Sequence, residues 1–311
     1  MNHSDSFINV AKVREVYQNG GNIIKYLKEN NEVAAPLSDI IEISYDLQAG
    51  TYIQHVNSNA DWAKSYWQEV ADLLLAHAPS SSGPGLTMLD VGSGELTTLS
   101  GVASLLPEDF AQEILAFDIS WSRLIKGKSY LASQHPDIAS RFRVFSADML
   151  RIPLPSNSID LITSNHALEP NRSQQMELMT ELFRVAKRRL VLCEPGYEIA
   201  SPEGRERMDE HGYIKDLDST VAALGGTMIA KIPLNIAANP LNPTVCYVID
   251  VPPGKDGTDR PDFTLPGSDA PLQETHGFYH SRQAGLSYPV LDGIPILRTK
   301  NAIVSTALLD E

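Results

Sequence analysis

The chain has few cysteines, no long apolar run and a shortage of positive charge, and each of these features excludes some classes of protein. Its 311 residues include only two cysteines, Cys193 and Cys246, both in apolar, strand-like segments. Two cysteines cannot build a disulfide framework or a cysteine zinc site, so we expect two reduced thiols in the core. No apolar run approaches the roughly 18 residues of a membrane helix. The first residues also lack the pattern of a secretion signal, so we expect a cytoplasmic protein.

Positive charge is scarce, because 25 Lys and Arg oppose 39 Asp and Glu, for a net charge of −14. Broad electrostatic binding of nucleic acid depends on Lys and Arg neutralising phosphates, so this balance argues against a nucleic-acid partner. The densest basic cluster, residues 187–189, is expected where a helix ends before a strand, and a helix C-terminus favours cations. We therefore interpret this cluster as a solvated helix end.

The most informative segment present is residues 86–100, which has the pattern of a buried strand, a glycine turn and a helix. Asp90 closes the strand, and Gly92 and Gly94 allow a tight bend with close approach of a ligand. The amides at the start of the following helix favour an anionic group. A dinucleotide-binding turn would have a small residue three positions after Gly94, where this chain has Thr97. The turn therefore favours a nucleotide-type ligand other than a dinucleotide.

Three further apolar segments each lead to a polar residue: 114–118 to Asp118, 142–148 to Asp148, and 159–164 to Asn165. A carboxylate at the position of Asp118 can accept hydrogen bonds from both hydroxyls of a ribose. Because the carboxyl ends of parallel strands lie at one edge of a sheet, we expect these side chains to share that edge with Asp90.

The chain divides into three regions by pattern. Apolar residues three and four apart over 10–17, 23–27 and 62–75 predict a helical cap or lid over residues 1–80. Strands alternate with helices over residues 81–252, which predicts an α/β, Rossmann-like domain whose parallel sheet has helices on both faces. Helices are expected at 203–213 and 215–224, and a terminal strand at 245–251. Residues 253–311 begin as a Pro- and Gly-rich linker and continue as a small α+β appendage.

Four motifs in order carry a family resemblance: Leu-Asp-Val-Gly-Ser-Gly, Phe-Asp118-Ile-Ser, Ser-Ala-Asp148-Met and Asp160-Leu-Ile-Thr-Ser-Asn-His. They resemble the successive motifs of the class I S-adenosylmethionine-dependent methyltransferases over roughly residues 40 to 252. The resemblance implies S-adenosylmethionine as cofactor, S-adenosylhomocysteine as product, and a terminal strand that lies antiparallel next to the sheet edge.

The resemblance also implies roles for single residues. Gly92 and Gly94 would border the methionine part of the cofactor, Asp118 with Ile119 beside it would hold the ribose, Asp148 and the Met149 amide would meet the adenine edge, and Asn165 would lie near the sulfonium. Tyr45 and Tyr52 are spaced like the lid tyrosines of small-molecule members of this family, although both could be amphipathic core tyrosines.

The predicted reaction needs mainly positioning, because the methyl group leaves a sulfonium by in-line displacement. A base is required only if the accepting oxygen or nitrogen is protonated. His166 at the sheet edge is our first candidate and His211 the second, while the alternative for His166 is a role in shaping the pocket. His276 and His280 are spaced like two metal ligands on one helix face, but no further ligand joins them, so we expect no metal.

The C-terminal segment carries a second resemblance. Residues 287–297 resemble the Tyr-Pro-x-x-Asp-Gly-Ile-Pro-x-Leu segment of Trm112-like zinc-ribbon proteins, which act as partners of several methyltransferases. The cysteines that such ribbons often use for zinc are absent from this segment. We expect it to fold by packing on the main domain.

Three functional interpretations follow. The first is methyl transfer to oxygen or nitrogen of a small metabolite or natural-product intermediate, because a cap of some 80 residues would enclose a small acceptor. The second is methylation of a protein or ribosomal RNA with the Trm112-like segment as a built-in activator. The third is a non-catalytic, cofactor-binding assembly protein. The sequence leaves a homodimer and the identity of the acceptor open.

Overall fold

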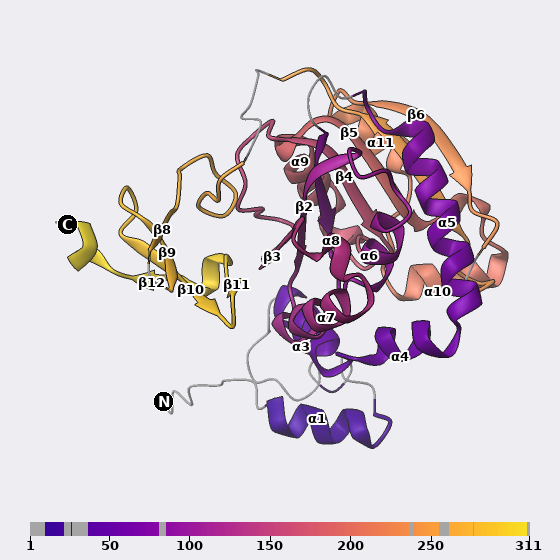
Figure 1. The fold of residues 1–311 in the computed structure, drawn as a ribbon. Helices are drawn as coiled ribbons and strands as arrows, with labels where there is room; N and C mark the ends of the chain where they lie inside the picture. The colour runs from indigo at the N-terminus through magenta and orange to yellow at the C-terminus, as the bar shows by residue number, and fades with distance from the viewer. Residues whose placement is uncertain are drawn as a thin grey trace.

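A seven-stranded sheet forms the centre of the computed structural model, which describes residues 10–21, 26, 37–80, 85–236, 239–254, 261–275 and 277–309. Figure 1 shows this sheet between layers of helices. The strand order is β3-β2-β1-β4-β5-β7-β6. The strands are β1 Leu86–Val91, β2 Ala111–Asp118, β3 Phe142–Ser146, β4 Ile159–Asn165, β5 Ala186–Pro195, β6 Thr227–Pro233 and β7 Thr244–Asp250.

Strands β1 to β5 pair in parallel, and β7 runs antiparallel between β5 and β6. This confirms the α/β fold class, with its antiparallel strand next to the edge. Every residue of β1 is buried, as expected for a central parallel strand covered on both faces. Cys193 and Cys246 are opposite each other on β5 and β7, and both are buried free thiols. Within the described ranges, no helix has the length and apolar character needed to cross a membrane.

The helices around the sheet are α5 Ala60–His77, α6 Thr97–Ala103, α7 Trp121–Gln134, α8 Pro136–Ala139, α9 Gln175–Val185, α10 Pro202–Glu210 and α11 Leu217–Ala223. The predictions for residues 62–75, 203–213 and 215–224 correspond to α5, α10 and α11. The edge strand β6 was not predicted, because its residues alternate only between exposed and half-buried positions.

The interpretation of residues 187–189 as a helix end is wrong, since they lie within β5. Neighbouring strands neutralise the charge of the two arginines. Arg189 Nε lies 2.7 Å from Asp250 Oδ1 on β7, and Arg188 Nε lies 3.5 Å from Asp160 Oδ1 on β4. The strand can hold Arg188 and Arg189 because a carboxylate faces each of them.

Three N-terminal helices precede α5: α1 Val10–Gln18, α3 Leu37–Leu47 and α4 Thr51–Ser58. Of the predicted helical segment 23–27, only Tyr26 lies within the described residues. Glu95, which follows the glycine turn and is almost fully buried, accepts hydrogen bonds from the amides of Gly50 (2.8 Å) and Ile53 (2.9 Å) at the start of α4. A carboxylate is favourable at a helix N-terminus, so Glu95 ties the cap to the glycine turn.

The C-terminal segment forms a small antiparallel sheet from β8 Gln273–Thr275, β9 Phe278–Ser281, β10 Leu286–Leu291, β11 Ile294–Pro295 and β12 Ile303–Val304. His280 lies on β9, with Nδ1 3.0 Å from Ser287 Oγ, and therefore not on a helix face. His276, its proposed neighbour in sequence, lies outside the described residues.

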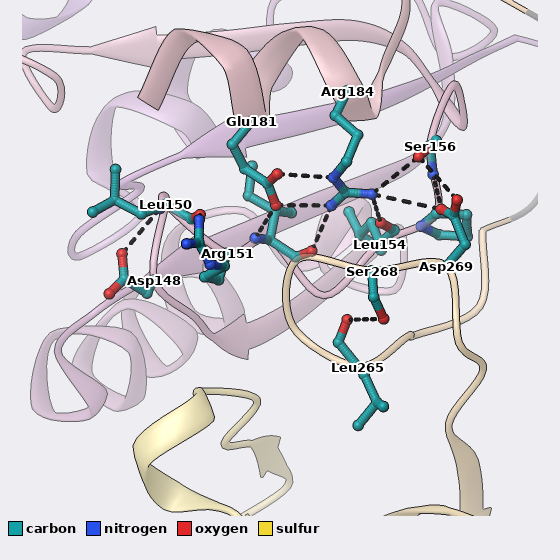
Figure 2. A network of polar contacts seen from close by, with 12 residues as sticks. Asp148, Leu150, Arg151, Leu154, Ser156, Glu181, Arg184, Leu265, Ser268 and Asp269 are labelled. Carbon is teal, nitrogen blue, oxygen red and sulfur yellow. Dashed lines mark hydrogen bonds and ion pairs between the residues drawn. The ribbon is translucent and has the colours of Figure 1, made fainter. Parts of the chain in front are cut away.

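This small sheet packs on the main domain, as expected from the sequence. Phe263, Leu272, Tyr288 and Leu297 are buried in the same apolar cluster as the central strands. Figure 2 shows a polar contact between the same two parts of the chain. Asp269 of the C-terminal segment accepts hydrogen bonds from the amide (2.6 Å) and hydroxyl (3.1 Å) of Ser156. The domain boundaries at residues 80 and 252 stay predictions.

Candidate active site

A cavity of about 590 Å³ opens at the carboxyl ends of β1, β2 and β4. Strand β1 pairs with both β2 and β4, so the cavity lies where the strand order reverses, which is the usual ligand site of an open α/β sheet. Helices α3, α4 and α5 cover it with Tyr45, Tyr52, Trp62 and Tyr66. Its volume suits a small-molecule site.

The glycine turn requires glycine at both positions. Gly92 (φ 70°) and Gly94 (φ 53°) have left-handed backbones. A Cβ on Gly92 would lie 2.5 Å from the Ala167 Cβ, and one on Gly94 would lie 2.2 Å from Arg123 Nη2. Gly92 lines the cavity, whereas the Gly94 amide donates to Asp118 Oδ2 at 2.9 Å. The turn thus brings bare backbone to the cavity and fixes the neighbouring carboxylate.

Asp118 ends β2 at the cavity and is buried. Oδ1 accepts from the Ser120 amide at 2.9 Å, and Oδ2 lies 3.6 Å from Arg123 Nη1. Ile119 also lines the cavity. Two backbone donors hold the carboxylate in one orientation, with acceptor capacity left for a ligand.

Arg123 is a cavity residue that the sequence interpretation missed. Its guanidinium carbon lies 5.2 Å from the ring centre of Tyr45 and 4.8 Å from that of Tyr52, and the residue is 8% exposed. A cation in the first turn of α7 opposes the helix dipole, and this anomaly is the signal that could have identified it. The site therefore holds a buried positive charge beside Asp118.

Asp90 lies deeper than predicted. Its Oδ1 accepts a hydrogen bond from Thr163 Oγ1 at 2.7 Å, and it lines a smaller adjoining cavity of about 70 Å³. Burial raises the pKa of Asp90 to about 6. Asp90 therefore bonds to β4 and does not line the main cavity.

Asp148, Met149 and Asn165 all line the main cavity. Asp148 lies in the loop after β3, where Oδ1 accepts from the Leu150 amide at 3.0 Å, a contact that Figure 2 shows. Asn165 Oδ1 accepts from the Tyr66 hydroxyl at 2.8 Å. Tyr66 was missed because the pattern of α5 predicted only an apolar face.

His166 also lines the cavity and has a left-handed backbone (φ 51°). It directly follows β4, whereas Asp118 ends β2, and β1 lies between these two strands. Its Nε2 lies 2.7 Å from Thr244 Oγ1 and its Nδ1 3.3 Å from Glu169 Oε2. Burial alone would lower the pKa of His166, but the hydrogen bond and charge of Glu169 and the charge of Glu194 outweigh it and raise the pKa. A non-glycine residue in this conformation, with an oriented ring, is typical of functional sites.

The structure does not bring His211 to the cavity. His211 follows the last residue of α10 and is exposed, and its Nδ1 lies 2.9 Å from the carbonyl oxygen of Arg207. Its neighbours Arg207 and Tyr213 line the cavity instead. His211 is therefore not placed to accept a proton from a substrate in this cavity.

Glu194 supports the segment that presents Asn165 and His166. Its side chain is fully buried, and Oε1 accepts from Ser164 Oγ (2.7 Å) and from the Ala167 amide (3.1 Å). Burial raises the pKa of Glu194 to about 7. The carboxyl group therefore takes up its proton near neutral pH.

The raised pKa of Glu194 predicts a stability that depends on pH. An unfolded Glu titrates near 4.5, so between about pH 4.5 and 7 the folded chain holds a proton that the unfolded chain has lost. The free energy of unfolding should fall as pH rises through this window, and Asp90 adds a change of the same sign. Replacing Glu194 by Gln should remove a contribution on the order of 3 kcal/mol between pH 5 and 7.5.

Urea unfolding at both pH values measures this contribution, with the exposed Glu203→Gln variant as control. Equal pH dependence in the Glu194→Gln variant and the wild type would contradict it.

Comparisons with known proteins bear on this site. Residues 88–189 match the family described as a methyltransferase domain. Magnesium protoporphyrin IX methyltransferase from Synechocystis PCC 6803, solved with bound SAH, is 11% identical, with a TM-score of 0.48 over 78% of this chain and 99% of that one. Geranyl diphosphate C-methyltransferase from Streptomyces coelicolor A3(2) is 13% identical, with a TM-score of 0.45 over 58% of this chain and 77% of that one. No curated protein matches the sequence.

The family match ends before the C-terminal segment, so the resemblance of residues 287–297 to Trm112-like proteins is not confirmed. The four motifs fall within or beside the matched range. Residues 88–189 therefore match a methyltransferase domain, as these motifs predicted, and S-adenosylmethionine is the methyl donor that the resemblance of the motifs implies.

Proposed function

We propose that the protein transfers the methyl group of S-adenosylmethionine to an oxygen or nitrogen atom of a small metabolite. The observation that carries the proposal is the cavity itself, which is lined both by predicted cofactor residues and by polar residues around His166. A site that encloses its reactants can orient the acceptor and exclude water.

Several residues of the cavity fit the cofactor. Gly92 leaves space beside its backbone that a Cβ would fill. Asp118 offers a carboxylate for the ribose hydroxyls. Buried Arg123, whose Nε has no hydrogen-bond partner among the described residues, suits the carboxylate of the methionine part. Asp148 and Met149 are placed for the adenine. When bound, the cofactor supplies an electrophilic methyl group.

The cavity also offers groups that recognise a polar acceptor. These groups belong to His166, Glu169, Arg207, Tyr213, Asn242 and Thr244, which all line the cavity. His166 is the residue best placed to accept a proton from a hydroxyl or amine, because Glu169 lies 3.3 Å from its Nδ1 and orients the ring. A pocket with these groups supports catalysis over simple cofactor storage.

No observation favours the macromolecular substrate. The residues that line the cavity come from positions 41 to 244, and none belongs to the described part of the C-terminal segment. An activating role for that segment through direct contact with the acceptor is therefore not supported.

The proposal is tested by adding the protein and S-adenosylmethionine to a metabolite extract and detecting small molecules that gain one methyl group by mass spectrometry. The Asp118→Ala protein serves as the matched control and should give no such product. Methylation confined to protein or RNA in the extract would overturn the choice of a small acceptor.

A further inference from the structure

The C-terminal segment contacts two elements that carry cavity residues: α3 and the turn after β2. After β11, residues 296–297 run along the edge strand β3, where the Leu297 amide donates to the Ser146 carbonyl at 2.8 Å. The next residue, Arg298, points into the protein and its side chain is 3% exposed. Its Nη1 lies 2.5 Å from Glu42 Oε1 and donates to the Ile119 carbonyl at 3.4 Å. One guanidinium thus joins α3 to the turn after β2.

Both partners of Arg298 are next to cavity residues. Glu42 follows Ile41 and lies one turn before Tyr45 on α3, and both of these residues line the cavity. Ile119 lines the cavity directly after Asp118. A shift between α3 and this turn would therefore change the distance from Tyr45 to Asp118.

A second contact joins the same two elements. Asp46, beside Tyr45, accepts hydrogen bonds from Ser120 Oγ (2.7 Å) and Ser122 Oγ (2.9 Å) at the start of α7. Arg298 and Asp46 therefore hold α3 to the β2–α7 turn at two points one helical turn apart.

The charges at this junction differ in burial. Lys300 also pairs with Glu42 (2.6 Å) and with Asp39 (2.7 Å), but its side chain is 42% exposed. An exposed ion pair contributes little, whereas a buried charge that loses its partner is costly. Of the two cations at this junction, Arg298 should therefore contribute more than Lys300.

We propose that Arg298 is a positioning residue for the cofactor: it fastens α3 to the turn that carries Asp118 and Ile119, and so makes the C-terminal segment part of the cofactor site. This inference rests on the proposed function. It assigns to the segment a role in cofactor affinity, reached through α3, with no contact to the acceptor.

The test compares Arg298→Met, Glu42→Ala and their double variant with Lys300→Met as the matched control. Affinity for S-adenosylhomocysteine is measured by calorimetry. We expect each single change at the buried pair to weaken binding about tenfold, as for the loss of one charged hydrogen bond. The double variant should be no weaker than the weaker single variant, because both changes break one junction. Lys300→Met should stay within about twofold of wild type.

A conservative variant separates positioning from general stability. Arg298→Lys keeps a charged donor and should recover most of the affinity for S-adenosylhomocysteine. This recovery does not require the melting temperature to return to the wild-type value. If Arg298→Met does not fold, Glu42→Ala, on the partly exposed helix, decides the question. Wild-type affinity in the Arg298→Met or Glu42→Ala protein, or an equal loss in Lys300→Met, would overturn the proposal.

Hydrogen exchange over residues 37–47 distinguishes failure of this inference from failure of the proposed function. If the wild type does not bind S-adenosylhomocysteine, the proposed function fails, yet α3 should still exchange faster in Arg298→Met than in Lys300→Met. Equal exchange of α3 in both variants would refute the fastening itself.

Discussion

A chain that ends at residue 252 is expected not to fold into a stable protein. The deletion removes Phe263, Leu272, Tyr288 and Leu297 from the core that they share with the central sheet. It also uncovers Phe145, whose ring centre lies 4.9 Å from that of Phe263. Loss of one large buried side chain costs about 2 to 5 kcal/mol, and the whole stability of a domain is about 5 to 15 kcal/mol. Circular dichroism and thermal unfolding measure the outcome.

Point variants in the C-terminal segment measure how much single residues contribute to this stability. Phe263→Ala should lower the free energy of unfolding by about 3 to 5 kcal/mol in the full chain. Val304→Ser, at a position 76% exposed on the same small sheet, should leave it nearly unchanged. A truncated chain that unfolds cooperatively near the wild-type temperature would show that the main domain is self-sufficient.

Replacing His166 by Ala should lower turnover by about 10²- to 10⁴-fold, the contribution of a general base. Affinity for S-adenosylhomocysteine should be nearly unchanged, because the side-chain contacts of His166 are with Glu169 and Thr244 and not with the proposed cofactor residues. Steady-state kinetics with the acceptor found by mass spectrometry, together with calorimetry, separates the two quantities.

The pH profile decides between a base and a residue that only shapes the pocket. Because carboxylates raise the pKa of His166, turnover should rise with pH as the ring loses its proton. Glu169→Gln removes a main cause of the raised pKa and should move this rise to lower pH. Thr244→Val, which removes only the neutral partner of Nε2, serves as the comparison. A profile that is the same with and without Glu169 would rule out His166 as the base.

The sequence predicted the sheet because its central strands are buried on both faces and appear as continuous apolar runs. Edge elements were harder, since β6 alternates at partial exposure and residues 187–189 gain their partners only from strands distant in sequence. Local pattern contains no information about such cross-strand carboxylates.

The cofactor end of the site was predictable because the glycine turn and the acids after successive strands lie within short motifs. The cavity walls were not, because Arg123, Tyr66 and Arg207 reach the site from helix faces that also serve packing. His211 was predicted wrongly as a catalytic candidate, because its position at the end of α10 leaves the ring exposed to solvent. The contact of Arg298 with Ile119 joins positions 179 residues apart, and no spacing in the sequence points to it.

The central claim is that the cavity binds an adenosyl cofactor, and calorimetric titration with S-adenosylhomocysteine at neutral pH tests it most directly. The wild type should bind, and Asp118→Ala should bind about 10- to 150-fold more weakly, because it loses charged hydrogen bonds to the ribose. Circular dichroism of the variant controls for loss of the Gly94 and Ser120 contacts. Absence of binding by the folded wild-type protein would contradict the account.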